Sequence, residues 1–260
     1  MPNSTYTDAI AINEEGTVTG YFGVQATGLS QGFLRSASGK ITILSYPGQS
    51  ATFTGGINDF GVIAGSYGTS TVGGFLYRNG HYQNVLVKGQ PAPLNDINDE
   101  GYYVGAYGTL GALTAFLASP TGEITDLQYP GAVWTDPLLV KGKGQVIGLY
   151  TDTYATNYTF LYSAASGYRT LSIPGVPGAT IVDINSSGAI VGGYFNGVTD
   201  RGFVYQNGKF QIVVPPGFTD SVVGAINNKG QLVGSCSTPS TTQIGFIATP
   251  VAASPPGAAR

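Results

Sequence analysis

The chain has 260 residues, of which only 10% are charged, and its formal net charge is −3. A nucleic-acid-binding protein needs a basic surface, so this balance excludes nucleic acid as an expected partner. No apolar run approaches the roughly 20 residues that span a bilayer, so we expect no membrane span.

A repeat of the form Ile-Asn-x-x-Gly runs through the whole chain. The final glycines of its copies are Gly16, Gly61, Gly101, Gly144, Gly188 and Gly230, spaced by 45, 40, 43, 44 and 42 residues. A period of about 40–45 residues with about four short strands per unit is typical of a propeller blade. The repeat therefore predicts an all-β fold, a six-bladed β-propeller with about four antiparallel strands per blade.

Each unit begins with a short segment, strand a, that ends at the motif asparagine. The six segments are residues 7–13, 52–58, 93–98, 135–141, 180–185 and 222–227. Asn-x-x-Gly suits a tight turn in which the asparagine side chain bonds back to the turn backbone. Unit four is the most divergent, because Lys141 replaces the asparagine.

Strand b follows the turn and is apolar on both faces, as in Ala189-Ile190-Val191. Such a strand is buried on both faces, which blade-against-blade packing requires. A glycine in the middle of strand b indicates a close approach, which we expect to be made by an aromatic ring of the adjacent blade.

Strand c contains the element resembling Gly-Phe-Leu-Tyr, and the Asn79-Gly80 and Asn207-Gly208 turns predict hairpins from strand c to strand d. Five d segments are visible, so 23 strands stand where six full blades need 24. Residues 249–254 are the candidate for the missing strand, and we expect the chain ends to pair and close the ring. We expect one domain over residues 5–249 and a tail or linker over residues 250–260.

These segments resemble the HAF-repeat family of predicted extracellular bacterial proteins, and the resemblance covers nearly the whole chain. The family has a histidine before the alanine and phenylalanine of strand c, whereas this chain has none there. The resemblance implies a secreted propeller. The start of the chain lacks the charged and apolar regions of a signal peptide, so we expect this sequence to carry no export signal.

Histidine chemistry is excluded because the only histidine, His81, starts an outer strand that faces solvent. Ser-His-Asp catalysis, Cys-His catalysis and histidine metal sites therefore have no candidates. The single cysteine, Cys236, is interpreted as a small buried hydrophobe. We assign no catalytic residue and expect no cofactor.

Carboxylates on strand a are the remaining route to acid–base or metal chemistry. They are Asp8, Asp96, Asp136, Asp183 and Asp220. Strand a of a propeller lines the axial channel, where inward carboxylates can hold calcium or serve as acid and base. The alternative is that these residues cap turns and bind water.

The most distinctive loops lie in units three to five, on the face that carries the b–c and d–a connections. The predicted ligand-binding residues there are Trp134, Asp136, Asp152, Tyr154, Tyr158, Asp200 and Arg201. Aromatic rings mixed with short polar groups suit sugars, although the same residues also occur in ordinary solvated loops.

Three functional hypotheses remain open. The first is a secreted, monomeric module that binds glycan or another extracellular polymer. The second is a lyase or hydrolase that uses channel carboxylates and tyrosines without histidine. The third is a structural or interaction protein of the cell envelope or an extracellular assembly. The lack of a catalytic constellation argues against the enzyme.

Overall fold

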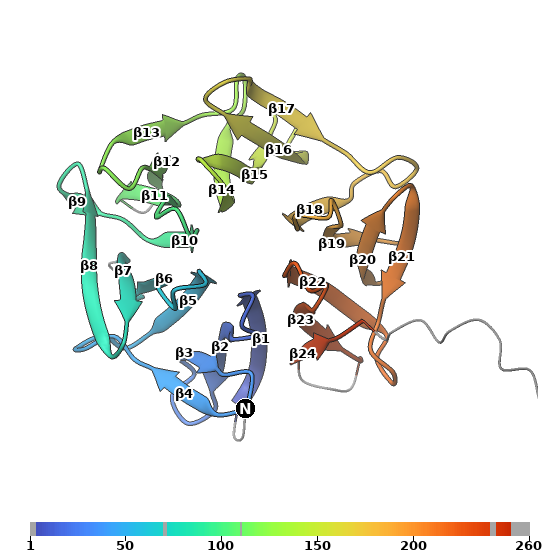
Figure 1. Cartoon of the computed structure of the whole chain (residues 1–260), viewed down its shortest axis with the longest axis horizontal. Helices are drawn as coiled ribbons and strands as arrows, with labels where there is room; N and C mark the ends of the chain where they lie inside the picture. The colour runs from blue at the N-terminus through green and yellow to red at the C-terminus, as the bar shows by residue number, and fades with distance from the viewer. Residues whose placement is uncertain (1–3, 70–71, 110, 240–242, 251–260) are drawn as a thin grey trace, which may run out of the picture.

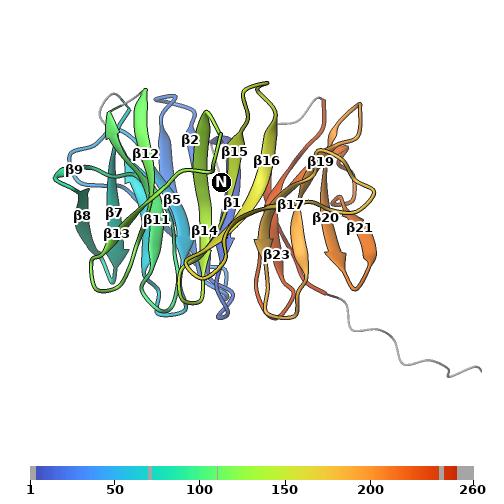
Figure 2. The same ribbon diagram turned by 90° about the horizontal axis from the view of Figure 1, so that it is seen from above.

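The computed structural model describes residues 4–69, 72–109, 111–239 and 243–250. These residues form six antiparallel sheets arranged around a central axis, which is the six-bladed propeller that the repeat predicts (Figure 1). The strands run between two ends of a short cylinder (Figure 2), so connections gather on two opposite faces. In the described part of the chain, no helix is suited to crossing a membrane.

The strands of each blade run from the axis outward in sequence order. Blade 1 holds β1 (Ser4–Ile12), β2 (Val18–Val24), β3 (Ser30–Arg35) and β4 (Ile41–Leu44), and blade 2 holds β5 (Thr52–Ile57), β6 (Ile63–Tyr67), β7 (Gly73–Arg78), β8 (His81–Val87) and β9 (Gln90–Pro91). Blade 3 holds β10 (Leu94–Ile97), β11 (Tyr103–Thr109), β12 (Ala112–Ala118) and β13 (Ile124–Leu127), and blade 4 holds β14 (Trp134–Lys141), β15 (Gln145–Thr151), β16 (Asn157–Ser163) and β17 (Gly167–Leu171). Blade 5 holds β18 (Thr180–Ile184), β19 (Ile190–Phe195), β20 (Asp200–Gln206) and β21 (Lys209–Val213), and blade 6 holds β22 (Asp220–Ile226), β23 (Leu232–Ser237) and β24 (Ile244–Ala248).

The distribution of strands differs from the expected one at two places. Blade 2 gains the short β9, which pairs with β8, and blade 6 has three strands in the described part of the chain. Residues 251–254, most of the segment predicted to supply the missing strand, lie outside the described residues, as does nearly all of the predicted tail. That strand and the boundaries of the domain therefore stay predictions.

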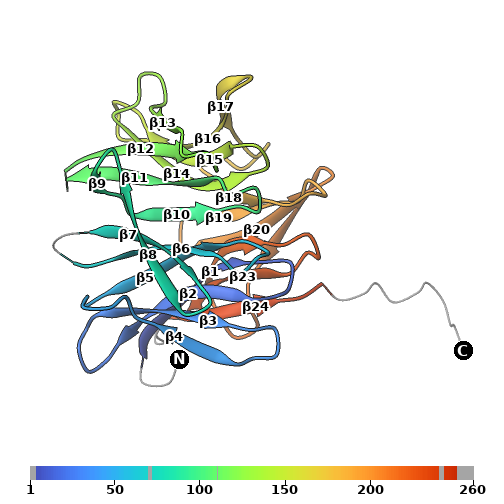
Figure 3. The ribbon, with the colours of Figure 1, turned by 60° about the vertical axis from the view of Figure 1, so that its left-hand side comes forward.

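In the described part of the chain, the boundary between blade 6 and blade 1 is held by packing and polar contacts, and the expected pairing of strands from the two chain ends stays a prediction. Among the described residues, β1 and β24 belong to separate sheets (Figures 1 and 3). The Thr7 N–H donates to the Gln243 carbonyl at 3.0 Å, and the Gln243 amide donates to Asp8 at 2.6 Å. Buried Ala9 and Val233 share one hydrophobic cluster across this boundary. Packing and polar contacts thus close the ring.

The motif asparagine has two roles, of which only one was expected. Its Oδ1 accepts the N–H four residues later at 2.9 to 3.0 Å, which closes its own turn as predicted. Its Nδ2 donates to a backbone carbonyl of the next blade, which is at the equivalent position in four pairs and one residue later, at Gly142, in blade 4. The pairs are Asn13 and Asn58 (3.2 Å), Asn58 and Asn98 (3.1 Å), Asn98 and Gly142 (2.6 Å), Asn185 and Asn227 (3.2 Å), and Asn227 and Asn13 (3.1 Å). These bonds form a ring that is interrupted only between blades 4 and 5.

A second set of bonds lies beside the first. The residue after the asparagine donates its N–H to the side chain at the equivalent position of the next blade. The pairs are Glu14 and Asp59 (2.8 Å), Asp59 and Asp99 (2.7 Å), Ser186 and Asn228 (2.8 Å), and Asn228 and Glu14 (2.7 Å). Blade 4 has Gly142 at this position, which offers no side-chain acceptor. Blade 4 is therefore the weak member of both sets.

The glycine in the middle of strand b lies under an aromatic ring, but of its own blade. Gly20 pairs with Phe33, Gly65 with Phe75 and Gly148 with Phe160 on the neighbouring strand c. A Cβ added to any of these glycines would collide with the paired ring. The expectation of a ring from the adjacent blade was wrong, because the contact is made across the sheet rather than between sheets.

We predict that Asn58→Ala lowers the free energy of unfolding by about 2–4 kcal/mol, because it removes two hydrogen bonds of a buried side chain and leaves the N–H of Val62 without its acceptor. Urea unfolding measures this loss. The matched control is Asn79→Gly, a turn asparagine with a φ of 50° that glycine adopts freely. The control should change stability by less than about 0.5 kcal/mol. Equal losses in the two variants would contradict the role of the inter-blade bond.

Candidate functional site

An axial cavity of about 1000 Å³ is lined mainly by the six innermost strands. Each of these strands has a β-bulge where it pairs with strand b. In five blades the extra residue is the third before the motif position, and in blade 2 the bulge lies between Thr54 and Ile57. The extra residues at these bulges face the cavity, and they are Ile10, Gly55 and Gly56, Asn95, Leu138, Val182 and Gly224. A bulge re-aims side chains. These bulges therefore decide which groups reach the channel.

Three of the five predicted channel carboxylates line the cavity: Asp96, Asp136 and Asp183. The other two have different places. Asp8 accepts from Gln243 at the junction of blades 1 and 6, and Asp220 accepts the N–H of Asp200 at 3.3 Å. The channel prediction was thus right for the strands of blades 3, 4 and 5.

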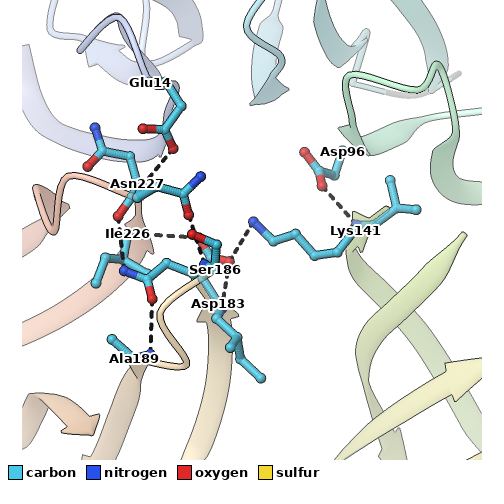
Figure 4. Close-up of polar contacts among 12 residues, drawn as sticks. Glu14, Asp96, Lys141, Asp183, Ser186, Ala189, Ile226 and Asn227 are labelled. Carbon is cyan, nitrogen blue, oxygen red and sulfur yellow. Dashed lines mark hydrogen bonds and ion pairs between the residues drawn. The ribbon is translucent and has the colours of Figure 1, made fainter. Parts of the chain in front are cut away.

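Lys141, the residue that replaces the motif asparagine, lies between two of these carboxylates (Figure 4). Its Nζ pairs with Asp183 Oδ1 at 2.8 Å, and Asp96 Oδ2 accepts the N–H of Val140 at 2.8 Å. Burial alone would lower the pKa of Lys141, but the charges of Asp183 and Asp96 outweigh it and hold the pKa above its ordinary value. Lys141 is therefore a charged bridge between blades 4 and 5.

Asp183 is fully committed to this arrangement. The side chain is 6% exposed, and its Oδ2 accepts the N–H of Ile226 in blade 6 at 3.0 Å. Its Oδ1 accepts the N–H of Ile184 at 2.7 Å in addition to the ion pair with Lys141. One buried carboxylate thus joins three consecutive blades.

Asp96 and Asp136 differ from Asp183 because no cationic side chain among the described residues forms an ion pair with them. Burial raises the pKa of Asp96 to about 7, against the opposing charge of Lys141 and the N–H of Val140. Burial also raises the pKa of Asp136 to about 6, although the amide of Asn95 donates to it at 3.1 Å. Both carboxyls exchange protons near neutral pH, which is the range that acid–base chemistry requires.

Exposed aromatic side chains gather on the loop face of blades 4 and 5. Among the described residues, the exposed aromatic side chains are Phe60, Trp134, Tyr154, Tyr158 and Phe195. Four of these five lie at the b–c or d–a ends of blades 4 and 5, and Tyr154 is 87% exposed. Only Phe60 lies on the opposite face, in the turn between β5 and β6. The loop face therefore carries the one aromatic patch that a ligand can reach in the described part of the molecule.

The register of blade 4 separates two of the predicted ligand-binding residues. Trp134 pairs with Thr151, whereas Tyr158 pairs with Tyr150, the next residue along β15. Neighbouring residues of a strand point to opposite faces, so Trp134 and Tyr158 lie on opposite faces of the blade. A ligand must reach over the rim of blade 4 to touch both.

Tyr158 ends a stack of three tyrosines on the face towards blade 3. Its ring centroid lies 5.2 Å from that of Tyr150, which in turn stacks on Tyr129 at 3.7 Å with parallel planes. Both Tyr129 and Tyr150 also hydrogen-bond to the hydroxyl of Thr170. The stack holds Tyr158 in a defined place with 39% of its surface exposed. It is a rigid platform of the kind that stacking recognition uses.

The remaining predicted site residues have separate surroundings. Asp152 accepts the N–H groups of Tyr154 and Thr156, both at 2.9 Å, and so shapes the loop between β15 and β16. Asp136 lines the channel rather than the rim. Asp200 and Arg201 begin β20 of blade 5, and Arg201 pairs with Tyr194. Arg201 and Phe203 are two residues apart on β20, so their side chains lie on the same face of the blade. Phe203 packs in the cluster beside blade 4, so Arg201 also points towards blade 4.

The residues that were set aside as non-functional are where the sequence predicted. His81 begins the outer strand β8 and is exposed. Cys236 is buried, with its thiol near the carbonyl of Ile244 at 3.6 Å. In the part of the chain that the structure describes, no group of three or more His, Cys, Asp or Glu side chains is arranged to hold a metal ion.

The chain resembles known proteins in its fold alone. No protein-family model and no curated protein matches its sequence. A triple mutant of AofleA from Arthrobotrys oligospora is 12% identical, with a TM-score of 0.62 over 95% of this chain and 84% of that one. The gluconolactonase XC5397 from Xanthomonas campestris is also 12% identical, with a TM-score of 0.59 over 95% and 87% of the two chains.

TolB from Acinetobacter baumannii is 10% identical, with a TM-score of 0.58 over 78% of this chain. The match covers only 53% of TolB, so this chain corresponds to about half of that protein. Identities this low establish a shared propeller architecture and leave activity and ligand open.

We predict that Asp96→Asn makes stability less dependent on pH. The folded-state pKa of about 7 lies above the ordinary value of 3.8, so Asp96 costs stability progressively as pH rises between these values. Relative to the variant, the free energy of unfolding of the wild type should fall by on the order of 2–3 kcal/mol between pH 5 and pH 8. Urea unfolding at several pH values measures this difference.

The control for this experiment is Asp126→Asn. Its hydrogen bond to Lys88 lowers the pKa of Asp126, so the carboxyl is ionised in both the folded and unfolded states throughout pH 5 to 8. The difference between wild type and this variant should stay constant over the range. If the free energy of unfolding of the wild type also differs from that of Asp96→Asn by a constant amount over this range, the raised pKa of Asp96 is contradicted.

Proposed function

We propose that the protein is a binding module that recognises glycan, or a chemically similar extracellular polymer, on the loop face of blades 4 and 5. The observation that supports this most is the gathering of four of the five exposed aromatic side chains on this one face. Exposed rings beside short polar groups provide the apolar stacking surface and the hydroxyl partners that a sugar needs.

The two faces of blade 4 give this surface two stacking positions. Tyr158 is held on the blade 3 side by the tyrosine stack, and Trp134 is 47% exposed on the blade 5 side, towards Arg201. A polymer crossing the rim of blade 4 would place successive units on the two rings. A single sugar unit would contact only one of them, so we expect a chain of several units to bind more tightly than its monomer.

We also propose that the protein is a member of the HAF-repeat family, acts outside the cell and is a monomer. The spacing of the repeat supports the family. The monomeric state is supported by the packing, because the hydrophobic clusters of buried residues are shared mostly between neighbouring blades of one ring.

A second candidate function is histidine-independent acid–base catalysis in the channel. Asp96 and Asp136 favour it, since their raised pKa values of about 7 and about 6 suit proton transfer near neutral pH. Tyr21 also lines the cavity, but burial and the charge of Asp8 raise its pKa to about 12, so it stays protonated. A tyrosinate base is therefore not available at this position.

We predict that Trp134→Ala and Tyr158→Ala each weaken glycan binding by roughly 1–3 kcal/mol, because they remove anchor rings from the proposed surface. A glycan array, read with and without calcium, selects the ligand, and calorimetric titration measures the loss. The matched control is Phe60→Ala, which removes a ring that is 63% exposed on the opposite face. Binding that survives both rim variants, or that is lost in the control, would refute the proposed surface.

A further inference from the structure

The boundary between blades 4 and 5 differs from the other five boundaries in its packing. The residue before the motif asparagine packs against the preceding blade, as Val140 does against Leu117 and Val104 of blade 3. In five blades this residue is buried: Ile12 at 8%, Ile57 at 8%, Ile97 at 6%, Val140 at 1% and Ile226 at 5% exposed. Ile184 of blade 5 is the exception, since it is half-buried. The apolar surface at this boundary is thus incompletely covered.

Two further apolar residues at the boundary between blades 4 and 5 are also more exposed than their equivalents at the boundary between blades 3 and 4. Leu117 and Val146, which meet between blades 3 and 4, are 8% and 0% exposed. The equivalent residues between blades 4 and 5, Leu161 and Ile190, are both half-buried. The hydrophobic cluster at this boundary contains Leu171 of β17 but, among the described residues, none from β14, β15 or β16. Every other boundary has a cluster with inner-strand residues from both blades.

The cause lies in the sequence of unit four. Without an asparagine, blade 4 cannot make the short bond from side chain to backbone that draws each turn against the next. Lys141 spans the distance instead, with an ion pair from its long side chain to Asp183. A flexible lysine fixes the spacing of two blades less tightly than an asparagine amide does. The boundary is therefore held by the ion pair near the axis and by the bond from the Ile181 N–H to the Thr159 hydroxyl at 3.1 Å, while the packing around Leu161 and Ile184 stays incomplete.

The axial cavity extends into this opening. Its lining includes Gln145, Ile147, Leu161 and Arg169 on blade 4, and Val182 and Ile184 on blade 5. Leu161 and Arg169 belong to the third and fourth strands of their blade, whereas in the other blades the lining reaches no further than the second strand. The result is a radial crevice between blades 4 and 5 with an apolar wall formed by Leu161 and Ile184.

We propose that this crevice binds a small organic cation, an amine with an apolar body. The apolar body would lie against Leu161 and Ile184, which are partly exposed without it. The ammonium would lie at the axial end, where the cavity is acidic. Its ionisable acidic and basic lining residues are Glu14, Asp59, Asp96, Asp99, Glu100, Asp136, Asp183, Lys141 and Arg169.

The arrangement of these charges favours a cation over an anion. Seven of the nine are carboxylates, and Lys141 is already paired with Asp183. Arg169 lies on β17, the outermost strand of blade 4, where it is exposed to solvent and far from the axis. A cavity lined by one sign of charge concentrates ligands of the opposite sign. An anionic ligand would have to approach the carboxylates that line the axial end.

The direct test is methyl NMR of the intact protein titrated with hexylammonium, hexanoate and 1-hexanol, which share one apolar chain and differ in charge. We expect hexylammonium to shift the methyl signals of Leu161 and Ile184, with a dissociation constant on the order of 1 mM. Hexanoate should bind at least about tenfold more weakly, and added salt should weaken the cation. Equal binding of the three probes, or shifts confined to other methyl groups, would overturn the proposal.

A pair of matched variants tests the crevice itself. Leu161→Trp should fill the opening, abolish the hexylammonium shifts and leave the midpoint of thermal unfolding unchanged or higher. Leu117→Trp places the same ring in the packed boundary between blades 3 and 4, where it should lower the midpoint. If Leu161→Trp lowers the midpoint as far as Leu117→Trp does, the crevice is absent and the proposal fails. The wild-type titration decides the proposal even if either variant does not fold.

Discussion

The structure depends on one hydrogen bond, the donation from the motif asparagine to the backbone carbonyl of the next blade. A propeller blade cannot bury both of its faces alone, so stability comes from contacts between neighbours. The asparagine makes one contact within its blade and one between blades. Its side-chain oxygen closes the turn of its own blade, and its side-chain nitrogen binds the backbone of the next blade. The same residue therefore shapes the hairpin and sets the spacing of the ring, which explains why the motif is the most regular feature of the chain.

The repeat predicted the number of blades, the order of the strands and the outer position of His81, because these follow from local pattern and from the need to bury strand b on both faces. It did not predict the second role of Asn58, since the partner carbonyl of Asn98 is 40 residues away and becomes a neighbour only when the ring closes. The bulges in strand a were missed for the same reason. A bulge adds one residue to a strand without a compositional signal, yet it directs Asn95 towards Asp136.

The candidate sites were predictable to different degrees. Aromatic composition led to the loop face of blades 4 and 5, and the exposed rings do gather there. Composition could not separate Trp134 from Tyr158, because the face that each occupies depends on strand register. Their partners Thr151 and Tyr150 are adjacent residues of β15, so the two side chains lie on opposite faces of the blade. The raised pKa of Asp96 depends on burial by neighbouring blades, which no spacing of residues reveals.

Unit four contributes to both proposed sites, and this follows from how a repeat scaffold acquires specificity. In a ring of similar blades, a substitution that preserves every hydrogen bond between blades leaves neighbouring blades packed together, with no space between them for a ligand. Replacing one asparagine by Lys141 breaks the ring of bonds at a single boundary, while the buried carboxylate of Asp183 keeps that boundary together through an ion pair. The cost in packing is confined to one junction out of six. The same substitution supplies charge to the channel and opens an apolar wall beside it, which is the combination that a binding site for a charged small molecule requires.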